Sequence, residues 1–294
     1  LAWGLTLPVD VFWGVALPLI LAFAALSFVG AFAAHINTYA DYELDQKDDT
    51  KKKLTAAMSQ LGKGKLKTAM IIEVAISLMF ILALSFLQAK PVLLLMWMAA
   101  VFLAFVYSAK PLRLKSHSFF AVLTLLTVLS VLPVTFVTYV LTSRFDLAFL
   151  LFLAGQALTV YGVIVPAEIR DYFGDKAAGA NTMTVRLGLI KASVLGLGLL
   201  SIGAVLCGVG FVLKLASTNL PFLSGFLIVM TVGYLFILSK YARLYRLSKQ
   251  LQKKGEDSIE QNIVHLAAEN PKWITIVTQT IVLMSIILLI AKII

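Results

Sequence analysis

Two groups of oxygen-bearing side chains recur at helical spacing in this sequence, each near the end of a long apolar run. The first consists of Asn37, Asp41 and Asp45, and the second of Glu168, Asp171 and Asp175. Residues three or four positions apart lie on the same face of an α-helix. Each group therefore predicts a stripe along one helix face, and we name the two groups the first and the second acidic segment.

Acidic stripes of this kind predict a cation site. Like charges at helical spacing repel one another, and carboxylates at a membrane edge cost desolvation energy. The segments contain no Cys or His, so their oxygen ligands favour Mg²⁺, Ca²⁺ or Mn²⁺ over Zn²⁺. Two facing segments would suit two or more Mg²⁺ ions that clamp a diphosphate. The alternative is a set of solvated loop acids balanced by Lys, which is our interpretation of Asp48, Asp49, Glu256, Asp257 and Glu260.

The elements that must position these side chains are membrane helices. The chain has 294 residues, is 60% hydrophobic and only 14% charged, and a soluble domain would need far more charge on its surface. A bilayer core about 30 Å thick needs roughly 20 apolar residues per helix. Runs of this kind predict eight crossings, at residues 11–40, 68–89, 91–109, 118–141, 146–170, 188–213, 220–243 and 271–293.

A ninth helix is expected at the beginning of the sequence. Residues 1–9 read as the end of an apolar helix that Pro8 and Asp10 close. The prediction is therefore an all-α polytopic membrane protein, with its first helix truncated here and residues 1–294 forming a single transmembrane domain.

The basic residues predict the orientation in the membrane. Most of the 25 Lys and Arg residues follow the first, third, fifth and seventh runs, and cytoplasmic loops carry the excess of such residues. Both acidic segments then lie on the cytoplasmic side, and the C-terminus lies outside. The net charge of +10 is explained by this bias and by attraction to anionic lipids, without nucleic-acid binding. The single cysteine, Cys207, excludes a disulfide within the chain and a Cys-based metal site.

Basic and polar side chains on the same side are candidates for binding phosphate, which Lys neutralises and Arg engages through two hydrogen bonds. Each basic one also serves as an orientation signal, and we keep both interpretations. Glu73, one turn into the second run, is either a buried polar partner or a group that reaches the interface. The phosphate-binding candidates are Tyr107, Lys110, Arg113 and Lys115 after the third run, and Arg170 and Lys176 within the second segment.

These motifs together resemble the UbiA superfamily of intramembrane prenyltransferases. Asn37, Asp41 and Asp45 match its N-x-x-x-D-x-x-x-D motif, and EIRDYFGDKAAGANTMTVRLG, from Glu168 to Gly188, is similar to its second motif. The stretch YSAKPLRLK, from Tyr107 to Lys115, resembles its Y-S-x-x-P-x-R/K-L-K element. Glu168 stands where the family usually has Asp, and the Arg-Pro pair that follows the first motif in many members is absent after Lys51.

The resemblance implies nine transmembrane helices and Mg²⁺-dependent transfer of a polyprenyl group from a prenyl diphosphate to an acceptor, usually an aromatic quinone precursor. It implies an allylic carbocation and the release of diphosphate. By carry-over, the metal ligands are Asn37, Asp41, Asp45, Glu168, Asp171 and Asp175, and the catalytic residues are Asp41, Asp45, Asp171 and Asp175. The substrate-binding residues are Asn37, Tyr107, Lys110, Arg113, Lys115, Arg170 and Lys176.

A secondary transporter or another ion-binding membrane protein is the competing class, because carboxylates at the membrane edge also mark ion pathways. Two features argue against transport. Both segments are predicted at one face of the bilayer rather than at its midplane, and no charged residue lies at the centre of a long run.

Overall fold

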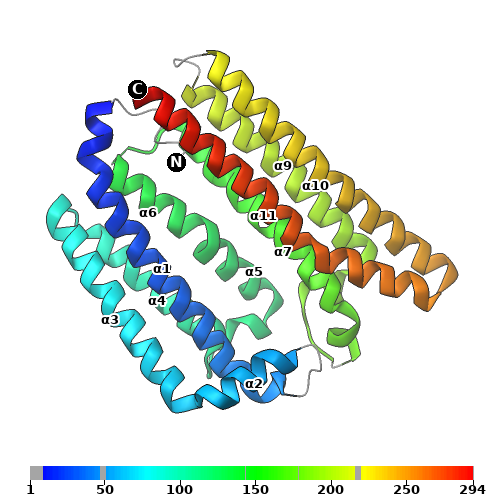
Figure 1. The fold of residues 1–294 in the computed structure, drawn as a ribbon. Helices are drawn as coiled ribbons and strands as arrows, with labels where there is room; N and C mark the ends of the chain where they lie inside the picture. Colours follow the sequence, from blue (N-terminus) through cyan, green and yellow to red (C-terminus); the bar gives the residue numbers. More distant parts are fainter. Residues whose placement is uncertain (1–8, 47–50, 143, 178, 216–219, 294) are drawn as a thin grey trace. The chain divides into compact units, whose positions relative to one another are not determined.

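The computed structural model describes residues 9–46, 51–142, 144–177, 179–215 and 220–293. All regular secondary structure in these ranges is helical (Figure 1). The eight predicted crossings correspond to eight long helical stretches, which confirms the all-α prediction. Residues 1–8, where most of the ninth helix was predicted, lie outside the described residues. The long stretches are α1 (Val9–Asp45), α3 (Lys63–Gln88), α4 (Val92–Ser108), α5 with η4 and α6 (Ser118–Leu141), α7 (Leu147–Ala177), α9 (Leu189–Leu215), α10 (Leu220–Lys254) and α11 (Asp257–Ile293).

Most of these stretches have the length and composition of membrane spans. Within the described residues, six are long and apolar enough to cross a bilayer, and α4 is a shorter apolar helix of 17 residues. Large apolar side chains such as Phe86 and Leu95 lie exposed on their surfaces. A bilayer is the solvent in which such a surface is stable, because each helix satisfies its backbone hydrogen bonds internally.

The helices form two compact units, which are described separately here. One unit comprises Gly14–Arg144, and the other comprises Phe145–Ile294 with residues 9–13 of α1. The first acidic segment lies at the end of α1 in the Gly14–Arg144 unit. The second lies in the last turns of α7 in the Phe145–Ile294 unit. Both helices continue through their segments, so the predicted stripes are helical.

The Gly14–Arg144 unit packs α1 with α3, α4 and α6 around a buried apolar cluster. We call this the lower cluster; its members are Ala22, Ile81, Leu84, Leu93, Phe136 and Val140. Nearer the first acidic segment, Glu73 of α3 lies beside His35 of α1, with 2.7 Å between Glu73 Oε1 and His35 Nδ1. Of the two interpretations of Glu73, the structure supports the buried polar partner.

The predicted helix at 118–141 is interrupted. It consists of α5 (Ser118–Leu126), a π-helical turn η4 (Thr127–Val131) and α6 (Leu132–Leu141). Pro133 follows the π turn and has no N–H to donate to a carbonyl of the preceding turn. Such turns occur as local insertions in α-helices, often at functional sites.

In the Phe145–Ile294 unit, α7 and α9 approach closely through glycines. A Cβ on Gly155 would lie 2.6 Å from the backbone nitrogen of Cys207 and 2.7 Å from the carbonyl oxygen of Gly203. A Cβ on Gly203 would lie 2.5 Å from Thr159 Oγ1. Small residues allow this approach, and packing of this kind drives helix association in a bilayer. The contact fixes the part of α7 that precedes the second acidic segment.

Pro166 interrupts the hydrogen bonds of α7 just before the second acidic segment. Because Pro166 has no N–H, the carbonyl of Gly162, four residues earlier, loses its helical donor. Tyr241 of α10 donates its hydroxyl to this carbonyl at 2.9 Å. The side-chain amide of Asn270 on α11 donates to the next carbonyl, that of Val163, at 3.2 Å. Two neighbouring helices thus stabilise α7 where it leads into the segment.

Candidate functional site

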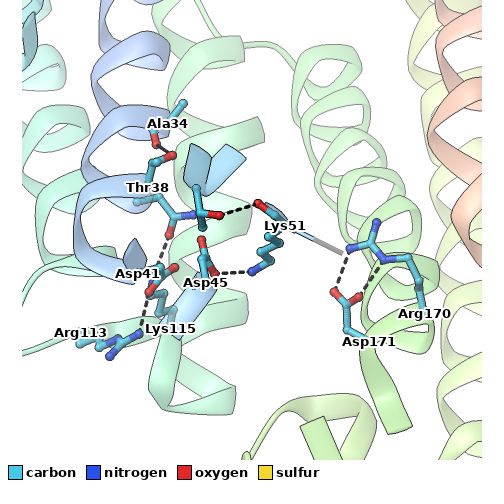
Figure 2. Close-up of polar contacts among 11 residues, drawn as sticks. Ala34, Thr38, Asp41, Asp45, Lys51, Arg113, Lys115, Arg170 and Asp171 are labelled. Carbon is cyan, nitrogen blue, oxygen red and sulfur yellow. Dashed lines mark hydrogen bonds and ion pairs between the residues drawn. The ribbon is translucent and has the colours of Figure 1, made fainter. Parts of the chain in front are cut away.

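The first acidic segment meets the loop between α4 and α5, which contains η3 (Leu114–Ser116). Arg113 Nη2 donates to Asp41 Oδ1 at 2.6 Å, and Lys115 Nζ donates to Asp41 Oδ2 (Figure 2). Lys115 Nζ also donates to Asn37 Oδ1 at 2.7 Å. Asn37 Oδ1 accepts a second hydrogen bond, of 3.2 Å, from Ser108 Oγ. The loop therefore brings two positive charges to the oxygen atoms of the stripe.

The backbone of the loop directs these side chains. Arg113 has a φ of 37°, in the left-handed region that few non-glycine residues adopt. Residues in such conformations cluster at functional sites, where the surrounding structure holds them. Burial lowers the pKa of Lys115, although its hydrogen bond to Asp41 acts in the opposite direction. The positive charge of Lys115 is therefore stabilised mainly by the oxygen atoms of Asn37 and Asp41 that face it.

Asp45, the last residue of the first segment, is buried and accepts a hydrogen bond of 2.6 Å from Lys51 Nζ (Figure 2). Lys51 directly precedes α2 (Lys52–Leu61). The pairing gives Lys51 a specific contact, beyond the orientation signal that its sequence context suggested. Sequence reasoning missed it because the partner depends on how the chain turns after α1.

The second acidic segment has different surroundings. Glu168 is half-buried, and Thr184 Oγ1 donates to Glu168 Oε2 at 2.7 Å. Thr184 belongs to the short helix α8 (Met183–Leu187), whose N-cap is Thr182. Asp171 is exposed and receives two hydrogen bonds from its neighbour Arg170, from Nε at 2.7 Å and from Nη2 at 2.9 Å (Figure 2).

The remaining candidates lie on α4, on α7 and in the loop after α4. Lys176 Nζ lies 5.7 Å from the centre of the Tyr172 ring, which is a cation–π distance. Tyr107 is half-buried in the last turn of α4, and Lys110 is exposed in the loop that follows. Asp175 is half-buried on α7, one turn beyond Asp171.

The oxygen atoms of the first segment are suitable ligands for a metal cation. Asn37 Oδ1 and Asp41 Oδ2 converge on one point of positive charge, the ammonium of Lys115. Within the described residues, no three His, Cys, Asp or Glu side chains gather closely enough to hold a metal ion. A metal ion bound here would therefore take further ligands from water or phosphate, as Mg²⁺ commonly does.

An apolar cavity of about 470 Å³ lies in the Gly14–Arg144 unit beside the first segment. Along α1 its wall extends from Ala25 to Ala34, and Asn37 follows three residues later on the same helix. Trp97 and Ala100 of α4 form the second wall. The third wall includes Val128 and Leu129 of the π turn, with Leu132, Pro133 and Phe136 of α6. An apolar cavity that adjoins a charged cluster suits a ligand with a lipid tail and a charged head.

The sequence model of the UbiA prenyltransferase family matches residues 1–258. The chain belongs to the UbiA prenyltransferase family. It is therefore a prenyltransferase, and its apolar helices make it an integral, multi-pass membrane protein. Membership decides against the transporter class that the acidic segments left open.

One solved structure supports the UbiA fold along almost the whole chain. It is described as "Structural and mechanistic insights into the biosynthesis of Digeranylgeranylglyceryl phosphate synthase in membranes". The two chains are 14% identical, with a TM-score of 0.58, and the match covers 97% of this chain and 89% of that chain. At this identity the likeness concerns the fold. A search of curated protein sequences finds no match.

In this UbiA protein the structure brings together four of the residues predicted from sequence, Asn37, Asp41, Arg113 and Lys115. It adds three residues that were not among the predicted site residues. Ser108 contacts Asn37, Thr184 contacts Glu168, and Lys51 contacts Asp45. Thr184 lies within the matched second motif, so the motif itself was the available signal for it.

Proposed function

We propose that this enzyme transfers a polyprenyl group from a prenyl diphosphate to an acceptor, and that the two acidic segments bind the diphosphate jointly with Mg²⁺. The main support is the position of Asp41, which lies between Arg113 and Lys115, about two helical turns beyond Ala34, the last residue of α1 that lines the apolar cavity. A carboxylate can hold a metal cation, and the two basic groups can hold phosphate oxygens. The cavity offers an apolar environment to a prenyl tail.

The proposed metal ligands are the members of the two segments. In the first, the convergence of Asn37 and Asp41 on one ammonium supports this role. In the second, the hydrogen bond from Thr184 holds Glu168 in place, and orientation of this kind is typical of groups that support metal sites. When bound, Mg²⁺ would neutralise charge on the leaving diphosphate. Because the two segments belong to separate units of the fold, their meeting around one diphosphate within a single domain is itself part of the proposal.

The proposed reaction begins at the bond between C1 of the prenyl chain and the diphosphate oxygen. This bond breaks, its electron pair stays on the diphosphate, and an allylic carbocation remains. Arg113 and Lys115 donate hydrogen bonds to the oxygen atoms on which negative charge grows. The acceptor then supplies an electron pair to C1 and loses a proton. Water would convert the cation to an alcohol, and the apolar walls of the cavity exclude it.

Other basic and aromatic side chains contribute to this scheme. Lys110, Arg170 and Lys176 add positive charge for the diphosphate, and the aromatic faces of Tyr107 and Tyr172 can stabilise a cation. The distribution of Lys and Arg supports a cytoplasmic position for both segments, with the C-terminus outside.

We propose an aromatic acceptor of the quinone-precursor type. The solved structure concerns a digeranylgeranylglyceryl phosphate synthase, and this favours a glycerophosphate-type lipid as the second candidate. A panel containing one hydroxybenzoate, one naphthoate and one glycerophosphate lipid separates the two classes by product analysis.

The test of the function is an assay with a labelled prenyl diphosphate and the detergent-solubilised protein, with and without EDTA. We expect release of diphosphate that requires metal and is lost in Asp41→Ala and in Asp171→Ala. Glu43→Gln is a matched control, because the Glu43 side chain lies on the same helix as Asp41, is 85% exposed and pairs with the exposed Lys63. Full activity in both alanine variants would refute the assigned roles.

A further inference from the structure

The cavity beside the first acidic segment has a definite depth. Ala25, the deepest cavity residue of α1, lies twelve residues before Asn37, or about 18 Å at 1.5 Å per residue. Trp97 of α4 lies eleven residues before Ser108, which contacts Asn37 and so marks the level of the charged end. The side chain of Trp97 is therefore at the deep end, opposite the charged cluster.

A chain of buried hydrogen bonds holds Trp97 in place. Trp97 Nε1 donates to Ser77 Oγ at 2.7 Å, and Ser77 Oγ donates to the carbonyl oxygen of Ala25 at 2.8 Å. Ser77 belongs to α3 and is 0% exposed. The chain connects α4, α3 and α1 at the depth where the cavity ends. Because a buried polar group that loses its partner costs free energy, the indole ring resists rotation away from this position.

The packing beyond Trp97 closes the deep end of the cavity. Trp97 and Met96 pack against the lower cluster, which includes Ile81, Leu84 and Leu93, each fully buried. Protein interiors of this kind are close-packed and do not yield easily to added volume. A ligand tail that reaches the indole therefore cannot extend further along the same direction.

We propose that Trp97, held by Ser77, sets the longest prenyl chain that the enzyme accepts. The inference rests on the proposed function, in which the cavity holds the prenyl tail. Carbon–carbon bonds are about 1.5 Å long, so an isoprene unit with four chain carbons extends about 5 Å. The distance of about 18 Å from Asn37 to the level of Ala25 holds between three and four such units. The enzyme then prefers prenyl diphosphates of that length.

Two substitutions test the proposal in opposite directions. Trp97→Leu removes the end wall, so activity moves toward longer donors. Ala100 also lines the cavity, and it lies one turn closer to the charged end on the same helix. Ala100→Leu therefore shortens the cavity and moves the preference toward shorter prenyl diphosphates. Ser77→Ala frees the indole and gives a smaller shift in the same direction as Trp97→Leu.

The measurement is kcat/KM for a series of prenyl diphosphates of two to eight isoprene units. For Trp97→Leu we expect the ratio of kcat/KM for a long donor to that for a short donor to rise by about tenfold or more, since discrimination of this size is typical of apolar contacts. Met98→Leu is the matched control, because Met98 is on the same helix, is 52% exposed and does not line the cavity. Its profile should equal that of the unmodified enzyme.

The outcomes separate the two claims. If the unmodified enzyme transfers no prenyl donor of any length, the proposed function fails. If it is active and both Trp97→Leu and Ala100→Leu keep its length profile, the role of Trp97 is overturned. If Trp97→Leu does not fold, Ala100→Leu still decides the matter. A thermal-shift series with unreactive prenyl thiodiphosphates should rank the prenyl chain lengths in the same order through binding alone.

Discussion

The two acidic segments share their helical spacing but differ in what neutralises them. In the first, cations from other parts of the chain contact the oxygen atoms: Arg113 and Lys115 at Asp41, and Lys51 at Asp45. In the second, the half-buried Glu168 contacts the uncharged Thr184, while the exposed Asp171 contacts its neighbour Arg170. A shared motif therefore does not imply a shared environment.

The difference suggests that the two segments have different roles in binding the diphosphate. Basic groups beside the first segment are suited to bind and release a multiply charged head group, because they already donate hydrogen bonds to charged oxygen atoms. The second segment is suited to hold a carboxylate in a fixed position, since a neutral donor and a braced helix orient it.

Close packing of α7 against α9 holds the helix that carries the second segment, and a substitution at Gly203 should disturb this packing most strongly. Gly203→Leu would place side-chain atoms against Thr159 and the backbone of Gly155, and overpacking of this kind costs about 1–3 kcal/mol or more. We expect a clear drop in the thermal unfolding temperature in detergent. Gly198→Leu is the control on the same helix, because a Cβ there meets no atom within 4 Å. Equal stability of the two variants would show that the close contact between α7 and α9 does not brace the helix.

Removal of the positive charge of Lys115 should weaken binding of the prenyl diphosphate. Lys115→Ala removes a hydrogen-bond donor that contacts both Asn37 and Asp41. We expect an activity loss of about 10–100-fold, which is the range typical of groups that support metal ligands. The measurement is kcat/KM for the prenyl diphosphate. Lys110→Ala removes an exposed charge from the same loop and should cost far less. A larger loss in Lys110→Ala would mean that the loop binds the diphosphate through a different residue.

The neutral donor of the second segment is tested by Thr184→Val. This change keeps the shape of the side chain but leaves Glu168 without the hydroxyl, at a cost of about 1–3 kcal/mol for a buried group. Activity should fall by about tenfold, at 1.4 kcal/mol per factor of ten. Thr184→Ser, which keeps the hydroxyl, should restore most of it. Activity that follows side-chain volume instead of the hydroxyl would contradict a role in orienting Glu168.

The smallest effect concerns the other end of α7. Asp146 caps this helix by accepting from the Phe149 N–H at 2.8 Å, and it pairs with Lys214 at 2.7 Å. The hydrogen bond from Lys214 lowers the pKa of Asp146 below its ordinary value of 3.8. Because the folded pKa is the lower one, the stabilisation is complete above the unfolded pKa and is lost as the pH falls through the folded pKa.

The variant Asp146→Asn keeps a capping side chain and removes the charge. We expect it to be less stable than the unmodified protein by under about 1 kcal/mol at pH 7, since the pair is half exposed. The difference should shrink as the pH is lowered below about 4. Thermal unfolding at a series of pH values measures it, and a difference that grows toward acid pH would contradict the sign.

The helices and stripes were predictable because they depend on local patterns. Apolar runs of bilayer length mark the helices, and the spacing of Asp41 and Asp45 marks a helix face. The interruption at Thr127–Val131 was missed, because one apolar run reads the same with or without a π turn. Contacts between distant residues were also missed. Nothing in the sequence around Ser77 or Trp97 shows that they share a hydrogen bond, and Thr184 has a partner only once α8 folds back onto α7.

If both acidic segments bind the same diphosphate, the distance between them must be short. Spin labels at Glu43→Cys on α1 and Ala177→Cys on α7, in a Cys207→Ala background, would report the separation by pulsed electron paramagnetic resonance. We expect a single short distance whose distribution narrows when Mg²⁺ and an unreactive prenyl thiodiphosphate are added together. A long distance, as expected for segments on opposite faces of the bilayer, that stays unchanged with both additions would contradict it.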